Sequence, residues 1–228
     1  MNTIYPLSSA IIMDDDIYEL YGGDSIKGTD SQRAAAYFIA EEAVSRDIST
    51  LLLPVTVTGT YSWNEYTPEL ITDWAYVHSV DAVRFIDTKG DIYYTITGTD
   101  NVYVSIRDSE YGIIDIQQLW RNCNCSSAAN PYPYQVQMVY QAGLPTGTAN
   151  QPNMLLALST YADIVMNEII GFGNEAPGGV GVQEFSNQSY REIRTKLGKT
   201  GFGSSARAQF VSSLLTSFRK LRYVKLGW

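Results

Sequence analysis

The chain has 228 residues, of which 45% are hydrophobic and 18% are charged, and its formal net charge is −8. This composition is typical of a globular protein and excludes an intrinsically disordered chain. A single histidine argues against imidazole catalysis and against a multi-histidine metal site. The two cysteines, Cys123 and Cys125, are too close together for an unstrained disulfide and too few for a zinc site. We therefore expect two free thiols, no cofactor and no metal.

The first residues carry no basic stretch followed by an apolar one, so we expect no secretory leader. No apolar run approaches the ~20 residues that a membrane span requires. We therefore expect a protein that is made in the cytoplasm and does not contact a membrane.

Charge is distributed unevenly along the chain. Residues 1–189 contain seven Lys or Arg and 23 Asp or Glu, whereas residues 190–228 contain nine Lys or Arg and one acidic residue, Glu192. An acidic body with a basic C-terminal segment favours self-assembly through unlike surfaces, docking on another protein, or nucleic-acid binding. A simpler alternative for the last basic residues is that they complement the negative end of a helix.

Residues 1–28 show no periodic pattern, and we expect an irregular segment. Thr29 followed by Gln32 is a capping box, which predicts a helix from Ser31 to Arg46. Residues 55–61 alternate and are rich in β-branched side chains, which predicts a strand.

A β-rich block follows and ends at residue 142. We expect Trp63–Trp74 to be a loop. The predicted strands cover residues 80–86, 92–96, 102–106, 113–116 and 134–142. The first two of them form a hairpin in which Gly90 supplies the positive φ of the turn.

The most regular stretch comes next. From Pro152 to Ile170, apolar residues recur at three- and four-residue steps, which predicts an amphipathic helix that ends at Gly171. A glycine-rich loop and a short helix within residues 186–197 should follow. A final helix is expected from Ser204 or Ser205 to about Tyr223.

This order of elements predicts an α+β fold. We expect a helical bundle of an N-terminal helix, a long central helix and a C-terminal helix, with an inserted antiparallel β module. The expected parts are an irregular segment over residues 1–28, a helical domain over 29–54 and 143–223, a β domain over 55–142, and a tail over 224–228.

Four segments together carry a resemblance to a known family. They are the hairpin Val80–Ile96, the strand and Ala-Gly turn of Val136–Pro145, the helix from Pro152, and Leu214–Tyr223. In this order the chain resembles the head-to-tail connector (adaptor) proteins of tailed phages. The resemblance implies a structural virion protein, assembled in the host cytoplasm, that forms a ring in the neck, usually a dodecamer. Such a ring joins the portal to the tail or stopper, and genomic DNA passes through its lumen without sequence-specific binding.

Two groups of residues are expected to make the contacts of such a ring. The resemblance implies that the C-terminal segment docks on the portal or neck, and its aromatic and arginine residues are of the kind that anchors interfaces. This docking group is Phe218, Arg219, Lys220, Leu221, Arg222, Tyr223, Lys225 and Trp228. Core packing of the last helix is an equal alternative for Phe218 and Leu221. The expected ring contacts are Arg191, Arg194, Lys196 and Lys199.

Two other classes of function remain open. The Tyr- and Trp-rich β block could stack on a sugar or a receptor as a binding module of a tail or virion protein. The basic residues 190–228 could bind nucleic acid with a strong salt dependence. An enzyme is not expected, because the sequence offers no nucleophile, base and acid in a recognisable set.

Overall fold

The computed structural model describes residues 5–22, 28–62, 69–87, 89–97, 103–116, 135–166 and 206–219. These residues form four helices and two antiparallel sheets, which is an α+β fold. The chain divides into two compact units. The described residues of the helical unit lie within Leu7–Ile48 and Gly147–Arg219, and those of the β unit lie within Met1–Pro6 and Ser49–Thr146.

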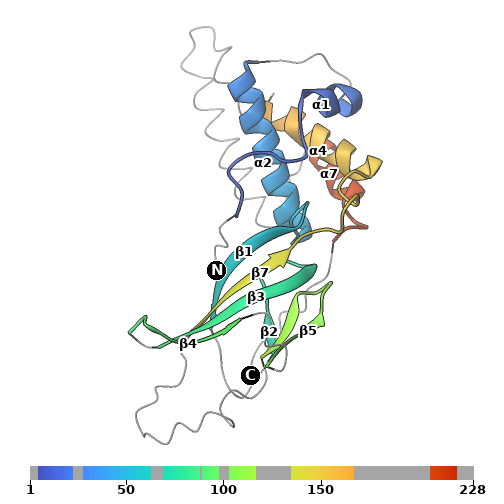
Figure 1. Cartoon of the computed structure of the whole chain (residues 1–228). Helices are drawn as coiled ribbons and strands as arrows, with labels where there is room; N and C mark the ends of the chain where they lie inside the picture. The colour runs from blue at the N-terminus through green and yellow to red at the C-terminus, as the bar shows by residue number, and fades with distance from the viewer. Residues whose placement is uncertain are drawn as a thin grey trace, which may run out of the picture. The chain divides into compact units, whose positions relative to one another are not determined.

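The helical unit is organised around helix α4, Pro152–Ile164. This helix packs against α1 (Asp15–Gly22), α2 (Asp30–Ile48) and α7 (Ala206–Leu214) (Figure 1). Nine of the 13 residues of α4 are buried. A helix that is buried on nearly every side lies in a core, and it is not a surface helix with one apolar face.

The expected helical bundle with a long central helix is wrong. The helices have 8 to 19 residues, and the helix that begins at Pro152 has 13. Apolar spacing predicts which residues become buried, but it does not predict where helical geometry changes. Val165 and Met166 already form a wider π-type turn, and residues 167–170 lie outside the described part. The C-terminal helix is also shorter than expected, because α7 ends at Leu214.

The beginning of α2 confirms the capping box. The Thr29 backbone N–H donates to Oε1 of Gln32 at 2.9 Å, and the Gln32 N–H donates to Oγ1 of Thr29 at 3.4 Å. This reciprocal pair satisfies two N–H groups that the first turn of a helix leaves without partners. The helix begins at Asp30, one residue before the predicted Ser31.

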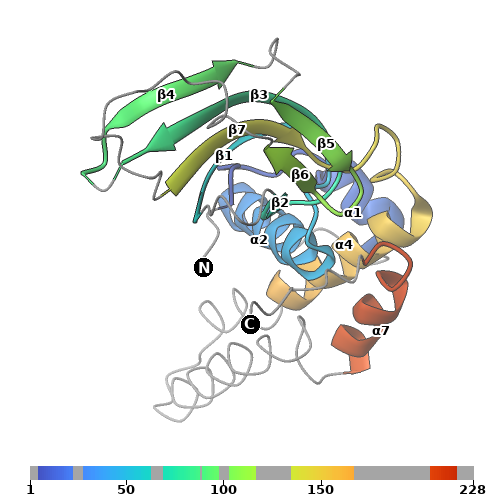
Figure 2. The same cartoon turned by 90° about the horizontal axis from the view of Figure 1, so that it is seen from below.

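The β unit contains a four-stranded and a three-stranded sheet. The four-stranded sheet has the order β1-β7-β3-β4 (Figure 2) and is formed by Val55–Ser62, Gln135–Ala142, Val77–Ile86 and Ile92–Thr97. The three-stranded sheet has the order β2-β6-β5 and is formed by Glu69–Ile71, Ile113–Ile116 and Val104–Asp108. The predicted hairpin is confirmed, because β3 pairs with β4 and Gly90 has a φ of 91°.

Strand β7 lies between β1 and β3 and alternates between buried and half-buried residues along its whole length. Its buried positions, Val136, Met138 and Tyr140, are those that the alternating sequence predicts. The Tyr140 hydroxyl lies 3.0 Å from the Tyr61 hydroxyl of β1. Burial raises the pKa of Tyr61, so this pair is a neutral hydrogen bond inside the sheet core.

The end of β7 requires a glycine. Gly143 has a φ of 148°, and a Cβ atom there would lie 2.1 Å from the backbone oxygen of Leu53. The Gly143 N–H donates to the carbonyl of Tyr76, and the Leu144 N–H donates to the carbonyl of Leu51. The Ala-Gly turn is therefore the point where three separate backbone segments of the β unit meet.

Two elements were not expected from the sequence. Helix α1 lies in the segment predicted to be irregular, and β2 lies in the predicted loop Trp63–Trp74. Both are short, and each depends on a distant partner: α1 buries Tyr18, and β2 pairs with β6. The expected short helix, glycine-rich loop and cysteine-containing loop lie outside the described residues.

Candidate assembly surface around the C-terminal helix

Helix α7 and the turn after it present one apolar stripe to the helical unit. Ala208, Val211, Leu215 and Phe218 are buried, and their spacing of three or four residues places them on one face. Phe210 lies off this stripe and is 46% exposed. Phe218, the first residue of the expected docking group, therefore packs in the core of its own chain.

An ion pair fixes the end of this segment. Nε and Nη2 of Arg219 lie 2.7 and 2.6 Å from Oδ2 of Asp47, at the C-terminal end of α2. Arg219 also donates to the Ser212 hydroxyl at 2.7 Å. Burial raises the pKa of Asp47, and the Arg219 hydrogen bond opposes this rise. Arg219, the second residue of the expected docking group, thus binds within the helical unit of its own chain.

A second carboxylate holds the beginning of α7. Asp163 on α4 is buried, and its two oxygens accept from Arg207 of α7 and, at 2.9 Å, from the Tyr18 hydroxyl of α1. Three helices therefore meet at one side chain. A charged group inside an apolar helix is stable only when such partners are present.

A third buried carboxylate holds the segment before α1. Glu41 on α2 accepts the backbone N–H groups of Ile11, Ile12 and Met13 at 2.7 to 2.8 Å. Burial raises the pKa of Glu41, and these three hydrogen bonds oppose the rise. The carboxylate replaces the hydrogen bonds that an irregular segment cannot make with itself.

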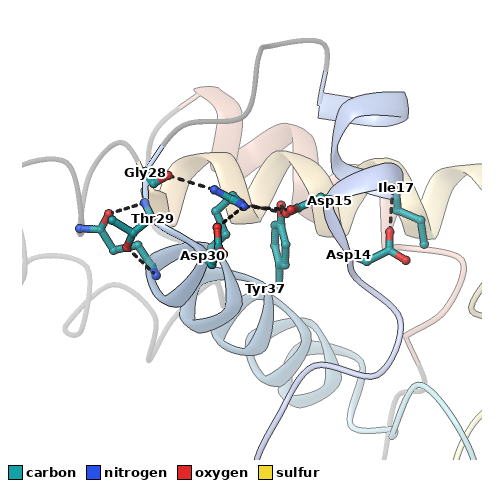
Figure 3. A network of polar contacts seen from close by, with 9 residues as sticks. Asp14, Asp15, Ile17, Gly28, Thr29, Asp30 and Tyr37 are labelled. Carbon is teal, nitrogen blue, oxygen red and sulfur yellow. Dashed lines mark hydrogen bonds and ion pairs between the residues drawn. The ribbon is translucent and has the colours of Figure 1, made fainter.

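A more exposed polar network joins α1 to α2, and Figure 3 shows it at close range. Arg33 donates to both oxygens of Asp15 at 2.9 and 3.0 Å and to Asp30 at 2.8 Å. The Tyr37 hydroxyl donates to Asp15 at 2.8 Å. The hydrogen bonds from Arg33 and Tyr37 lower the pKa of Asp15. Asp14 accepts the Ile17 N–H at 2.8 Å and caps α1.

Acidic residues outnumber basic residues in the described part of the chain. This part contains 17 Asp or Glu and seven Lys or Arg. In the helical unit, each of its four described arginines, at positions 33, 46, 207 and 219, forms an ion pair with a carboxylate of the same unit. The described surface is therefore acidic, and its arginines are already occupied in internal contacts.

The expected contact residues can be placed only in part. Phe218 and Arg219 are described, and both contact their own chain. The others lie outside the described residues: Lys220, Leu221, Arg222, Tyr223, Lys225, Trp228, Arg191, Arg194, Lys196 and Lys199. Sequence reasoning missed the roles of Glu41, Asp47 and Asp163. The isolated Asp163 within an apolar run was the one local signal of a buried partnered charge.

The described aromatic residues of the β unit include both buried and exposed side chains. Trp74 is buried against Tyr5, with ring centroids 6.0 Å apart, and Tyr61 and Tyr140 are buried in the sheet. Tyr94 remains 40% exposed. The side chain of His78 is also engaged, because its Nε2 lies 2.9 Å from the carbonyl oxygen of Gly143.

Among the described residues, no group of three or more His, Cys, Asp or Glu has the arrangement of a metal site. Within the same residues, none of the helices has the length and hydropathy to span a membrane.

Comparison with known proteins gives a likeness of fold. No family model matches the chain, and no curated protein matches it in sequence. One similar solved structure is a chain described as the neck of an empty gene transfer agent (GTA) particle, computed with C6 symmetry. It has a TM-score of 0.56 and 13% identity, over 93% of this chain and 92% of that chain. Another is from the neck of a native GTA particle computed with C12 symmetry, with a TM-score of 0.53 and 11% identity over 96% and 98% of the two chains. The protein therefore shares the fold of these two chains over more than nine-tenths of its length.

Proposed function

We propose that the protein is a structural component of a virion neck, a head-to-tail adaptor that assembles into a ring. The observation that carries this proposal is the likeness of fold to chains from GTA necks, which extends over more than nine-tenths of both chains. A likeness over more than nine-tenths of both chains argues for a similar building block and not for one shared motif.

The ring is supported by the symmetry of these neighbours. Their neck structures were computed with C6 and C12 symmetry, and a dodecamer is consistent with both. Closed cyclic assemblies form through contacts between unlike surfaces of identical chains. The described part is acidic and residues 190–228 are basic in sequence, so one chain carries the opposite charges that contacts between unlike surfaces would use.

In this proposal the ring joins the portal to the tail or stopper, and its lumen passes the genomic DNA. An acidic wall repels phosphate and does not retain DNA, whereas a basic wall would bind it tightly. The remaining members of the docking group, Lys220, Leu221, Arg222, Tyr223, Lys225 and Trp228, dock on the portal or neck. The buried contacts of Phe218 and Arg219 support this assignment indirectly, because they fix the point from which that segment starts.

Electron microscopy and mass photometry of the purified protein, alone and mixed with the portal protein of the same virion, test the ring. We expect a cyclic assembly, either free or bound beneath the portal. A protein that stays monomeric in both preparations contradicts the adaptor function.

A truncation tests the docking segment separately. A chain that lacks Tyr223 to Trp228 should keep its fold, because every described core residue is retained, but it should no longer bind the portal. A matched control is the substitution Ser217→Ala, an exposed position just before the segment, which should bind normally. Normal portal binding by the truncated chain would refute the docking role.

A further inference from the structure

The four-stranded sheet has one face that differs from the rest of the described surface. On β1, Thr56, Thr58 and Thr60 alternate with buried residues and are exposed. In register beside them on β7 lie Gln141, Val139 and Gln137. Since side chains alternate between the two sides of a strand, these residues share one face, which we call the outer face.

The outer face carries almost no charge. At the paired positions of all four strands that point to this side, Arg84 is the one charged residue, and it donates to Gln137 at 3.0 Å. One carboxylate also lies on this face: Asp81 is exposed in the bulge of β3 and accepts from Ser79, the register partner of Gln141. Arg84 and Asp81 together leave the face without net charge, and Asp87 and Asp91 lie at its margin in the β3–β4 turn.

This distribution matters for contacts between copies. Each chain has a net charge of −8, and the described residues have ten more acidic than basic side chains. Two such acidic surfaces repel each other, and like charges placed across an interface weaken it strongly. A face of hydroxyl and amide groups avoids this repulsion, and its burial leaves no carboxylate without a partner.

We propose that the outer face of the four-stranded sheet is an interface between copies of this chain. This inference rests on the proposed ring and names one of its contact surfaces. Four strands at ~4.8 Å spacing and about six residues at ~3.3 Å each give a footprint of roughly 400 Å². A standard interface buries about 800 Å² per partner, so this face supplies about half of one.

Charge substitutions on this face test the inference. The variant Thr58→Glu/Thr60→Glu places two carboxylates at exposed positions of β1. We expect this variant to keep the circular dichroism spectrum and unfolding midpoint of the wild type. For the double variant we expect the concentration of half-assembly, measured by mass photometry, to rise about 100-fold.

A matched control and a salt series separate contact from general repulsion. Thr216→Glu/Ser217→Glu adds the same charge at two exposed positions in the helical unit and should assemble as the wild type does. At ~1 M salt, where the screening length is ~3 Å, long-range repulsion is removed but a buried carboxylate still blocks contact. If the double β1 variant assembles normally, or if the control variant loses assembly equally, the interface is contradicted but the ring is not. If the wild type forms only a dimer and the β1 variant abolishes that dimer, the interface is supported and the ring is contradicted. If the wild type stays monomeric, both the interface and the ring are contradicted.

Discussion

Replacing Arg219 by Gln removes the cation that faces Asp47 in the helical unit. The Asp47 side chain is only 9% exposed, whereas that of Arg219 is 30% exposed. A fully buried charge that loses its partner destabilises a protein by about 3–5 kcal/mol. Because the Asp47 carboxylate is largely but not fully buried, Arg219→Gln should lower the unfolding free energy of the protein by about 2–3 kcal/mol. The reverse change, Asp47→Asn, leaves a partly solvated guanidinium that still binds Ser212, and should cost only ~1 kcal/mol.

The two single variants and the double variant form a cycle that isolates this pair. We expect Arg219→Gln to cost more than Asp47→Asn, and the double variant to lie close to Asp47→Asn. The exposed pair of Arg46 and Glu42 is the control, and Arg46→Gln should cost at most ~0.5 kcal/mol. Urea unfolding followed by circular dichroism measures all four.

The pH dependence gives an independent check of the same pair. Burial holds the pKa of Asp47 above 3.8 in the folded chain. The contribution of this carboxyl to the stability of the fold is therefore full below about pH 3.8 and falls as pH rises through the folded pKa. Without Arg219 the pKa rises further, and the difference between Arg219→Gln and the wild type should be larger at pH 7 than at pH 4. Unchanged stability of Arg219→Gln at pH 7, with loss of portal binding, would refute the structural role and assign Arg219 to docking.

Three further predictions concern the fold around these surfaces. Gly143→Ala should lower the unfolding free energy by about 3–5 kcal/mol, because the added Cβ would meet backbone atoms of Leu53 and Pro54. Gly147→Ala also has a positive φ but open space around it, and should lower the unfolding free energy by only ~1 kcal/mol. Equal midpoints of the two variants in urea would contradict this prediction. Thr29→Ala should lower the unfolding free energy by ~1 kcal/mol through loss of the α2 cap, and Thr29→Ser should restore it; an effect below 0.2 kcal/mol, on the order of the method's precision, would show that the cap is dispensable. The raised pKa of Glu41 means that its ionisation lowers the stability of the fold as pH rises above about 4.5. Glu41→Gln removes this ionisation, so the unfolding free energy of the variant should depend less on pH between about 4 and 7 than that of the wild type. An equal pH dependence of the two proteins in urea unfolding would contradict this prediction.

Some elements follow from local sequence because their causes are local. The capping box of Thr29 and Gln32 gives the beginning of α2, and alternation in residues 135–142 gives both β7 and its buried side. The β3–β4 hairpin follows from two β-branched segments around a turn glycine. Each of these signals lies within one continuous stretch of the chain, so no distant contact is needed to interpret it.

Other features were decided by contacts between residues far apart in the chain. Helix α1 has only eight residues, and its stability depends on Tyr18, which reaches Asp163 at a separation of 145 residues. The expected docking residues Phe218 and Arg219 have the same side-chain chemistry whether they anchor an interface or a core. Only the tertiary structure shows that Phe218 is buried and that Arg219 binds Asp47.

The sequence by itself determined the class of elements, the acidic character of the body and the basic character of residues 190–228, because these depend on composition and on short periodic patterns. The tertiary structure decided the lengths of the helices, the partners of Glu41, Asp47 and Asp163, and the low net charge of the outer face. A sheet face is formed by strands that are distant in the sequence, so its small number of charged residues becomes visible only when their register is known. Burial and pairing of charge are properties of the folded chain, and local spacing cannot specify them.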